Sequence, residues 1–157
     1  LADGRIFVSS LHPGLGWGVF LMSPKNDGKP VLERLQCDLV SKGQFHRASI
    51  SPSEKKICFE FQAGAGYVEV GHTLYIADFD SEKRTITNLQ VIANEERKRN
   101  WYAYPRWIQG ESAVVYHLNN TGKGQLYVYQ LEDGSTRRVS TNAAADYRYP
   151  HGEAAPC

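Results

Sequence analysis

The sequence predicts an all-β fold, built from a four-stranded antiparallel unit that recurs along the chain. Three observations support this prediction. Short runs rich in β-branched and aromatic residues recur throughout, turn-forming residues separate them, and distant segments match one another in order. Of the 157 residues, 41% are hydrophobic and 22% are charged, which is the composition of a folded globular protein.

The internal repeat is clearest between residues 48–59 and 105–116, which lie 57 positions apart. Each segment has the pattern of a strand, a polar turn and a second strand. A further pair of strands follows each copy, with residues 74–80 matching 126–132 and residues 85–87 matching 137–140. Four short strands therefore recur in the same order.

Partial copies lie at both ends of the chain. Residues 3–8 parallel residues 54–59, but no preceding strand is present, so the first copy lacks its first strand. Residues 147–151 repeat residues 102–106 at a distance of 45 positions, and only a first strand is recognisable there. Four-stranded repeats of about 40–50 residues are typical of β-propeller blades. We therefore predict about three blade equivalents, with approximate boundaries at 1–44, 45–101 and 102–146 and a further blade starting at 147–157.

Propellers usually close with roughly 4–8 blades, which is more than this chain supplies. We expect the ring to be completed either by the remaining blades of a longer chain or by a second protomer in a homodimer. The incomplete repeats at both ends favour a longer chain. In the homodimer, residues 147–151 of one protomer would supply the strand that is missing before Leu1 of the other.

The run Ser51–Phe59, followed by Leu74–Asp78 and Leu126–Ser140, resembles the TolB-type propeller repeat. The chain departs from that repeat where Ser53-Glu54 replaces the usual Asp-Gly turn, and where residues 108–111 lack the Ser-Pro pair. The resemblance implies a propeller fold. Because this repeat is frequent in exported bacterial proteins, it also implies a periplasmic or secreted location and a role like that of the periplasmic TolB scaffold.

Charge and hydropathy argue against two classes of partner. The formal net charge is +1, so the chain has no broad positive field that would attract nucleic acid. No run approaches the roughly 18 apolar residues of a membrane-spanning helix. We therefore expect neither nucleic-acid binding nor membrane insertion.

The cysteines and histidines offer few candidate sites. Cys58 lies in an apolar run and is expected to be a buried structural thiol. The histidines fall in different repeat units and none has the spacing of a metal motif, so structural roles are favoured. A propeller channel can nevertheless gather such residues around a divalent metal ion. The candidate metal-binding pair is His46 with His151, and the cofactor is otherwise unknown.

Aromatic residues concentrate near the predicted loops and first strands. There they would approach the channel or one rim of a propeller, and could stack on sugars or anchor a peptide. Packing between blades is an equally good explanation. The candidate ligand-binding residues are Trp17, Trp101, Tyr102, Tyr104, Arg106, Tyr147, Tyr149 and His151.

No catalytic residue is predicted, because the chain lacks a Gly-x-Ser-x-Gly elbow or another recognisable constellation. We predict an extracytoplasmic TolB-like binding or scaffolding module for protein or cell-envelope polysaccharide ligands. The alternative is a propeller enzyme or a part of one. It would be a metal-dependent carbohydrate lyase or hydrolase, or the propeller portion of a serine peptidase.

Overall fold

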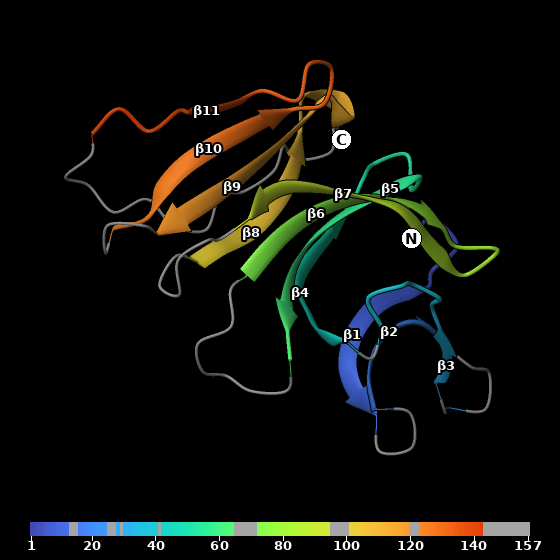
Figure 1. Ribbon diagram of the computed structural model, residues 1–157. Coiled ribbons are helices and arrows are strands. Elements are labelled where there is room, and N and C mark those ends of the chain that lie inside the picture. Colours follow the sequence, from blue (N-terminus) through green and yellow to red (C-terminus); the bar gives the residue numbers. More distant parts are fainter. Residues whose placement is uncertain are drawn as a thin grey trace.

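The structure is a computed structural model of the chain. It describes residues 1–12, 16–24, 28, 30–40, 42–64, 72–94, 101–119 and 123–142. In these ranges, eleven strands form three antiparallel sheets, which we call sheets A, B and C (Figure 1). One short 3-10 helix lies between two of the strands. The all-β prediction is therefore confirmed.

Consecutive strands pair with one another in every sheet. Sheet A has the order β1 (Ile6–His12), β2 (Gly16–Ser23) and β3 (Val31–Arg34). Sheet B has the order β4 (Gly43–Ile50), β5 (Lys56–Ala63), β6 (His72–Asp80) and β7 (Thr85–Asn94). Sheet C contains β8 (Trp101–Ile108), β9 (Ala113–Asn119), β10 (Gln125–Gln130) and β11 (Thr136–Arg138), with the 3-10 helix η1 (Gln109–Glu111) between β8 and β9. The four-stranded antiparallel unit is confirmed in sheets B and C, while sheet A has three strands among the described residues.

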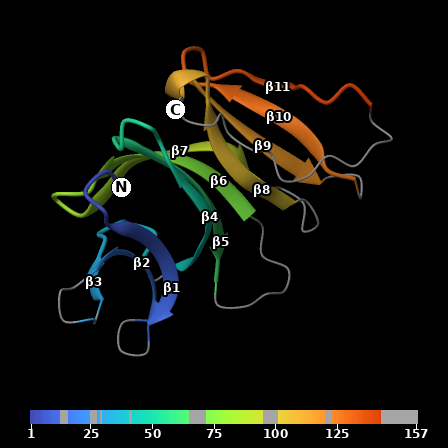
Figure 2. The ribbon, with the colours of Figure 1, turned by 180° about the vertical axis from the view of Figure 1, so that it is seen from behind.

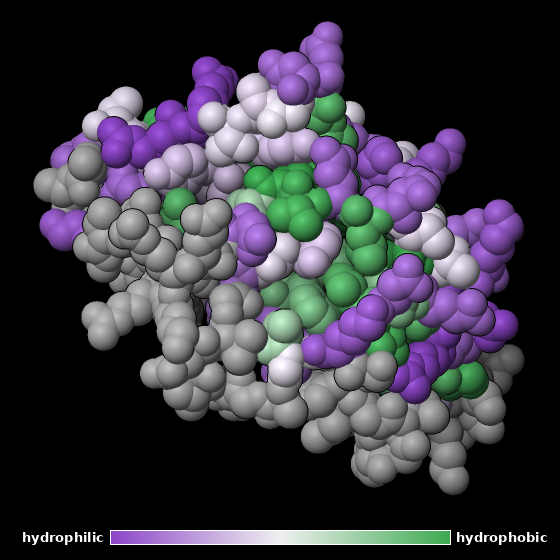
Figure 3. Space-filling model, in the orientation of Figure 1, coloured by the Kyte–Doolittle hydropathy of each residue, from purple (hydrophilic) through white to green (hydrophobic). Residues whose placement is uncertain are grey.

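Sheet B lies between the other two sheets, as Figures 1 and 2 show from opposite sides. Strand β4 contacts β1 and β2 of sheet A, while β8 of sheet C packs against β4, β5 and β6. Space-filling atoms in Figure 3 show hydrophobic residues gathered over the middle of one face, with hydrophilic residues around the margin. Among the described residues, no helix is long and apolar enough to cross a membrane.

Strand β5 is buried on both faces, because Ile57 through Gln62 are all inaccessible to solvent. Side chains alternate across a strand. Ile57, Phe59 and Phe61 therefore pack in the core between sheets A and B, and Cys58 packs in the core between sheets B and C. A strand with this pattern needs a neighbouring sheet on each side.

Irregularities of the backbone repeat at the same distance as the sequence. A β-bulge interrupts the pairing between His46 and Ser49 in sheet B, and another lies between Ala103 and Arg106 in sheet C. The bulge residues Arg47 and Tyr104 lie 57 positions apart, and both have a left-handed backbone, with φ of 49° and 56°. The turn residues Glu54 and Glu111, which are also 57 positions apart, have φ of 58° and 77°. Sheets B and C therefore share a detailed local geometry as well as a strand order.

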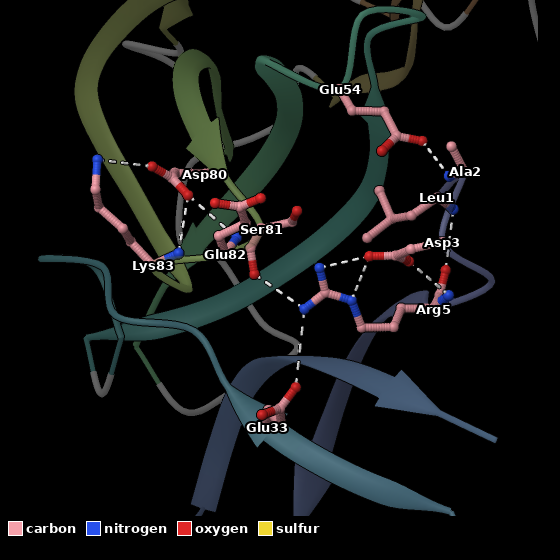
Figure 4. A network of polar contacts seen from close by, with 10 residues as sticks. All are labelled: Leu1, Ala2, Asp3, Arg5, Glu33, Glu54, Asp80, Ser81, Glu82 and Lys83. Atoms are coloured by element: carbon pink, nitrogen blue, oxygen red, sulfur yellow. Dashed lines mark hydrogen bonds and ion pairs between the residues drawn. The ribbon is translucent and has the colours of Figure 1, made fainter. Parts of the chain in front are cut away.

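Turn carboxylates join neighbouring sheets. The Glu54 carboxylate, in sheet B, accepts a hydrogen bond from the backbone N–H of Ala2, which precedes sheet A (Figure 4). The Glu111 carboxylate, between β8 and β9, accepts hydrogen bonds from the backbone N–H and the hydroxyl of Ser53 in sheet B, the latter at 2.7 Å. We call this repeated contact the turn clasp.

Arg5 adds a second connection between sheets A and B. Its guanidinium donates to the Ser81 carbonyl in the β6–β7 turn at 3.0 Å and to the Asp3 carboxylate at 2.7 Å (Figure 4). The Glu33 carboxylate of β3 lies 3.8 Å from the same guanidinium. The start of the chain is therefore held against the turns of sheet B.

Phe59 gives a direct test of the core between sheets A and B. Its ring is fully buried and lies 4.9 Å from the Phe45 ring and 5.5 Å from the Tyr75 ring. Replacing Phe59 by Ala is expected to lower the free energy of unfolding by about 3–5 kcal/mol, because it removes apolar contacts and leaves a cavity. Chemical denaturation measures this loss, and Val91→Ala, at an exposed site on β7, should change stability by less than about 0.5 kcal/mol.

Candidate functional site

A group of polar side chains lies where sheets B and C meet. We call it the inter-sheet polar cluster, and it consists of His46, Arg47, Glu60, His72, Tyr104 and His117. Strands β4, β5 and β6 supply its sheet B members, while β8 and β9 supply Tyr104 and His117. The strand register places His46 opposite Glu60. The apolar part of the same B–C interface contains Cys58, Leu74 and Ile76.

Glu60 is the centre of the cluster, and its side chain is 0% exposed. One carboxylate oxygen accepts a hydrogen bond from Arg47 Nη1 at 2.6 Å, and the other is in contact with His72 Nδ1. A buried carboxylate is costly unless its charge is balanced and its oxygens are engaged. Arg47 supplies the balancing charge.

Arg47 connects Glu60 to sheet C. Its guanidinium carbon lies 4.7 Å from the centre of the Tyr104 ring, which is cation–π geometry. Tyr104 stacks in turn on His117, with ring centres 5.6 Å apart and planes inclined by 25°. Burial favours the neutral form of Arg47, but the Glu60 charge and the hydrogen bonds to Glu60 and Tyr104 outweigh it and raise the pKa. The guanidinium is therefore a firmly charged link across the interface.

The two bulges create this arrangement. Arg47 and Tyr104 occupy equivalent left-handed positions of β4 and β8, and their partners Glu60 and His117 are also 57 positions apart. Each bulge residue therefore contacts the equivalent residue of the neighbouring strand. The cluster consists of two copies of one local motif that meet at the Arg47–Tyr104 contact.

The Ser49 carbonyl, next to the bulge in β4, also takes part in contact between the sheets. The indole N–H of Trp107, on β8, donates a hydrogen bond to the Ser49 carbonyl at 2.9 Å. The Cys58 thiol contacts the same carbonyl, at 3.6 Å. Burial raises the pKa of Cys58 well above its usual value, and the thiol is buried, as the sequence predicted.

His46 was predicted to bind a metal ion together with His151. The His46 ring lies beside His72, with ring centres 6.4 Å apart, whereas His151 lies outside the described residues. Burial lowers the pKa of His46, although the nearby Glu60 charge acts in the opposite direction. In the part of the chain that the structure describes, no three His, Cys, Asp or Glu residues are grouped to hold a metal ion. The metal site stays a prediction.

The predicted ligand-binding residues have different positions. Tyr104 belongs to the polar cluster, and Arg106, also on β8, is half-buried and donates to the Pro105 carbonyl at 2.9 Å. The backbones of Trp17, Trp101 and Tyr102 lie in strands β2 and β8, but their side chains are outside the described part of the structure. Tyr147, Tyr149 and His151 are also outside it.

The sequence prediction did not include Arg47, Glu60, His72 or His117. For two of these residues, the sequence contains a pattern from which a buried polar site could have been predicted. Glu60 interrupts an apolar run between Phe59 and Phe61, and His117 follows Val115-Tyr116 in a similar run. A charged or polar residue inside a buried strand requires a partner. The 57-residue repeat also places Glu60 and His117 at equivalent positions of their strands.

Comparison with known proteins identifies the architecture. No protein-family model matches the chain, and no curated protein matches its sequence. Its structure, however, is similar to TolB from Acinetobacter baumannii, with a TM-score of 0.59, 16% identity, and coverage of 92% of this chain and 31% of that chain. The chain has a propeller-like fold.

A second solved structure supports the same conclusion. A puromycin-hydrolysing peptidase from Mycobacterium tuberculosis aligns with a TM-score of 0.55 and 13% identity, covering 88% of this chain and 24% of that chain. The chain therefore spans about a third or less of the length of either protein. At these identities the similarity concerns the fold alone.

The Arg47–Glu60 pair is testable by a double-mutant cycle. Glu60→Gln is expected to lower the free energy of unfolding by about 3–5 kcal/mol, because Arg47 then loses its counter-charge in a partly buried site. Combining it with Arg47→Met should recover part of this loss, with a coupling of about 1–3 kcal/mol. The matched control is the exposed pair Lys56 and Asp78, at 2.9 Å, whose Lys56→Met and Asp78→Asn variants should couple by less than about 1 kcal/mol.

His46 is expected to make stability depend on pH. Because its pKa is lowered in the folded protein, the unfolded chain binds the proton more readily. The contribution of His46 to the free energy of unfolding is fully present above its unfolded pKa of about 6.5, and it is lost as the pH falls through its folded pKa. Denaturation measured from about pH 5 to pH 8 should show stability rising with pH up to about pH 6.5 and levelling off above it. His46→Gln should flatten this dependence, and an unchanged slope would contradict the assignment.

Proposed function

We propose that this chain is part of a non-catalytic, extracytoplasmic binding module, and that a protein partner binds at the first strands of sheets B and C. The observation that carries the proposal is the pair of left-handed bulge residues, Arg47 and Tyr104, at equivalent positions of β4 and β8. A non-glycine residue with positive φ is strained, and such strain is concentrated at functional positions. Bulges also turn side chains into new directions.

The chemistry of the bulge residues suits a protein partner. Arginine, tyrosine and tryptophan dominate the energetics of protein interfaces. The Arg47 side chain is 32% exposed, and both Glu60 and Tyr104 hold its guanidinium in place. A side chain that is already ordered loses little conformational entropy when a ligand binds. Arg47 is therefore ready to bind a carbonyl or carboxylate group of a partner.

The same geometry favours binding over catalysis. Glu60, the one acid that defines the cluster, is fully buried and enclosed by its Arg47 and His72 contacts, so we assign it the role of orienting these side chains. The similarity to TolB supports the choice of a propeller-like scaffold, and the proposed periplasmic or secreted location rests on the resemblance of the repeat. A cell-envelope polysaccharide is the alternative ligand.

Random-peptide phage display on the immobilised chain tests this proposal. We expect enriched peptides whose affinity falls at least about fivefold in the Arg47→Ala variant, the loss that truncating an important interface residue causes. Lys83→Ala is the matched control, because its side chain is 80% exposed on the β6–β7 turn, and it should leave affinity unchanged.

Circular dichroism of each variant separates loss of binding from loss of fold, and Arg47→Lys, which keeps the charge, provides a milder change at the same position. Failure to enrich any peptide would contradict the proposal. So would peptides that bind a folded Arg47→Ala variant as tightly as the unaltered chain. Saturable binding of purified peptidoglycan or acidic polysaccharide, without peptide binding, would instead support the alternative ligand.

A further inference from the structure

The first strands of the three sheets lie next to one another. Strands β1, β4 and β8 each stand at the edge of their own sheet, and β4 contacts both β1 and β8 (Figures 1 and 2). Bulges interrupt β4 at Arg47 and β8 at Tyr104. A bulged edge is a poor template for an added strand. A partner at these strands is therefore held by side chains rather than by strand pairing.

The first strands carry positive charge and no acidic residue. Arg47 lies in β4 and Arg106 in β8, whereas β1, β4 and β8 contain neither Asp nor Glu. Glu60 of β5 balances the charge of Arg47. Among the described residues, no carboxylate forms an ion pair with Arg106. The first strands therefore keep an unbalanced positive charge.

Arg106 lies at the same B–C interface as the polar cluster. It follows Tyr104 by two residues on β8, and its half-buried guanidinium donates to the neighbouring Pro105 carbonyl at 2.9 Å. Burial raises the pKa of Cys58, and the Arg106 charge acts in the opposite direction. Cys58 belongs to the core between sheets B and C. The charge of Arg106 therefore acts on the interface that Arg47 crosses.

Arg47 is oriented so that it can bind a second anion. Its guanidinium carries several N–H donors in a planar fork. Glu60 accepts from Nη1 at 2.6 Å, and Tyr104 lies against the guanidinium at 4.7 Å, while 32% of the side chain is exposed. These two contacts fix the plane of the fork. A carboxylate matches such a fork better than a single carbonyl oxygen does, because it offers two acceptors and a charge.

We propose that the partner presents the side-chain carboxylate of an acidic peptide segment, and that Arg47 and Arg106 bind it. This inference rests on the proposed function and specifies the chemistry of the partner. Arg47 donates to the carboxylate, and the charge of Arg106 stabilises it at the interface. An acidic polysaccharide would carry charges on many sugars and would need a long cationic track, whereas β1, β4 and β8 contain only these two Lys or Arg residues.

Paired synthetic peptides test the proposal. Peptides enriched by phage display on the immobilised chain are made with acetylated and amidated ends, so that Asp and Glu supply their only carboxylates. Each is compared with a copy in which Asp becomes Asn and Glu becomes Gln. We expect the amide copy to bind at least about tenfold more weakly, the loss typical of removing a charged hydrogen-bond partner. Affinity of the acidic peptide should fall as NaCl rises from about 50 to about 300 mM.

Variants of the chain show where the carboxylate binds. Arg106→Gln leaves the Arg47–Glu60 pair intact and should reduce the preference for acid over amide to below about threefold. Arg47→Ala should have the same effect, provided that circular dichroism shows it to be folded. Arg137→Ala is the matched control, because it removes an exposed arginine from β11, at the opposite edge of sheet C. It should leave the preference unchanged.

The outcomes separate this inference from the proposed function. Enriched peptides without Asp or Glu, or acid and amide copies of equal affinity, would overturn the inference, while their loss of binding in Arg47→Ala would still support the proposed function. A preference that folded Arg106→Gln and Arg47→Ala variants both retain, or that Arg137→Ala also abolishes, would overturn the assignment to the first strands. Binding of an acidic polysaccharide in place of peptides would overturn the peptide as partner. Failure to enrich any peptide would contradict both proposals.

Discussion

Burial of both faces of sheet B is the constraint on which the rest of the structure depends. Strand β5 presents aromatic and aliphatic side chains to sheet A on one face and Cys58, Glu60 and Gln62 on the other. Neither face tolerates water, so sheet B folds only with a neighbour on each side. The bulges, the turn clasps and the polar cluster are all features of these two interfaces.

The two interfaces of sheet B differ in chemistry. The core between sheets A and B is dominated by aromatic rings, in which Phe45, Phe59 and Tyr75 lie against one another. The interface between sheets B and C combines an apolar part with a buried charge, Glu60. A buried charge adds little net stability, but it requires partners at well-defined positions. It therefore restricts how sheet C can sit on sheet B, since only one placement brings Tyr104 beneath Arg47.

Much of the fold could be predicted from the sequence, because strands leave local signals. The β-branched and aromatic runs, the turn residues and the 57-residue repeat all depend on short stretches of chain, and they correctly predicted the four-stranded antiparallel sheets B and C. The Cys58 environment was predictable for the same reason, since its neighbours in the sequence are apolar.

The candidate site was harder to predict because it depends on long-range geometry. Tyr104 was selected for its aromatic character and its position on a first strand, but its partners come from β4 and β9. Whether Arg47 points toward Tyr104 depends on the bulge, which shifts the strand register and has no turn residue to mark it. His72 contacts Glu60 across two paired strands, and nothing in its own sequence neighbourhood indicates that contact.

The central claim is that the three sheets form one cooperative unit through the two faces of sheet B. Native-state hydrogen exchange of the backbone amides tests it most directly, because it measures the opening free energy of each strand separately. The account predicts that amides of β4, β5, β6, β8 and β9 exchange through one common opening, with the slowest rates in β5. Exchange of β8 and β9 at a much lower opening free energy than β5 would show that sheet C folds independently, and would contradict the account.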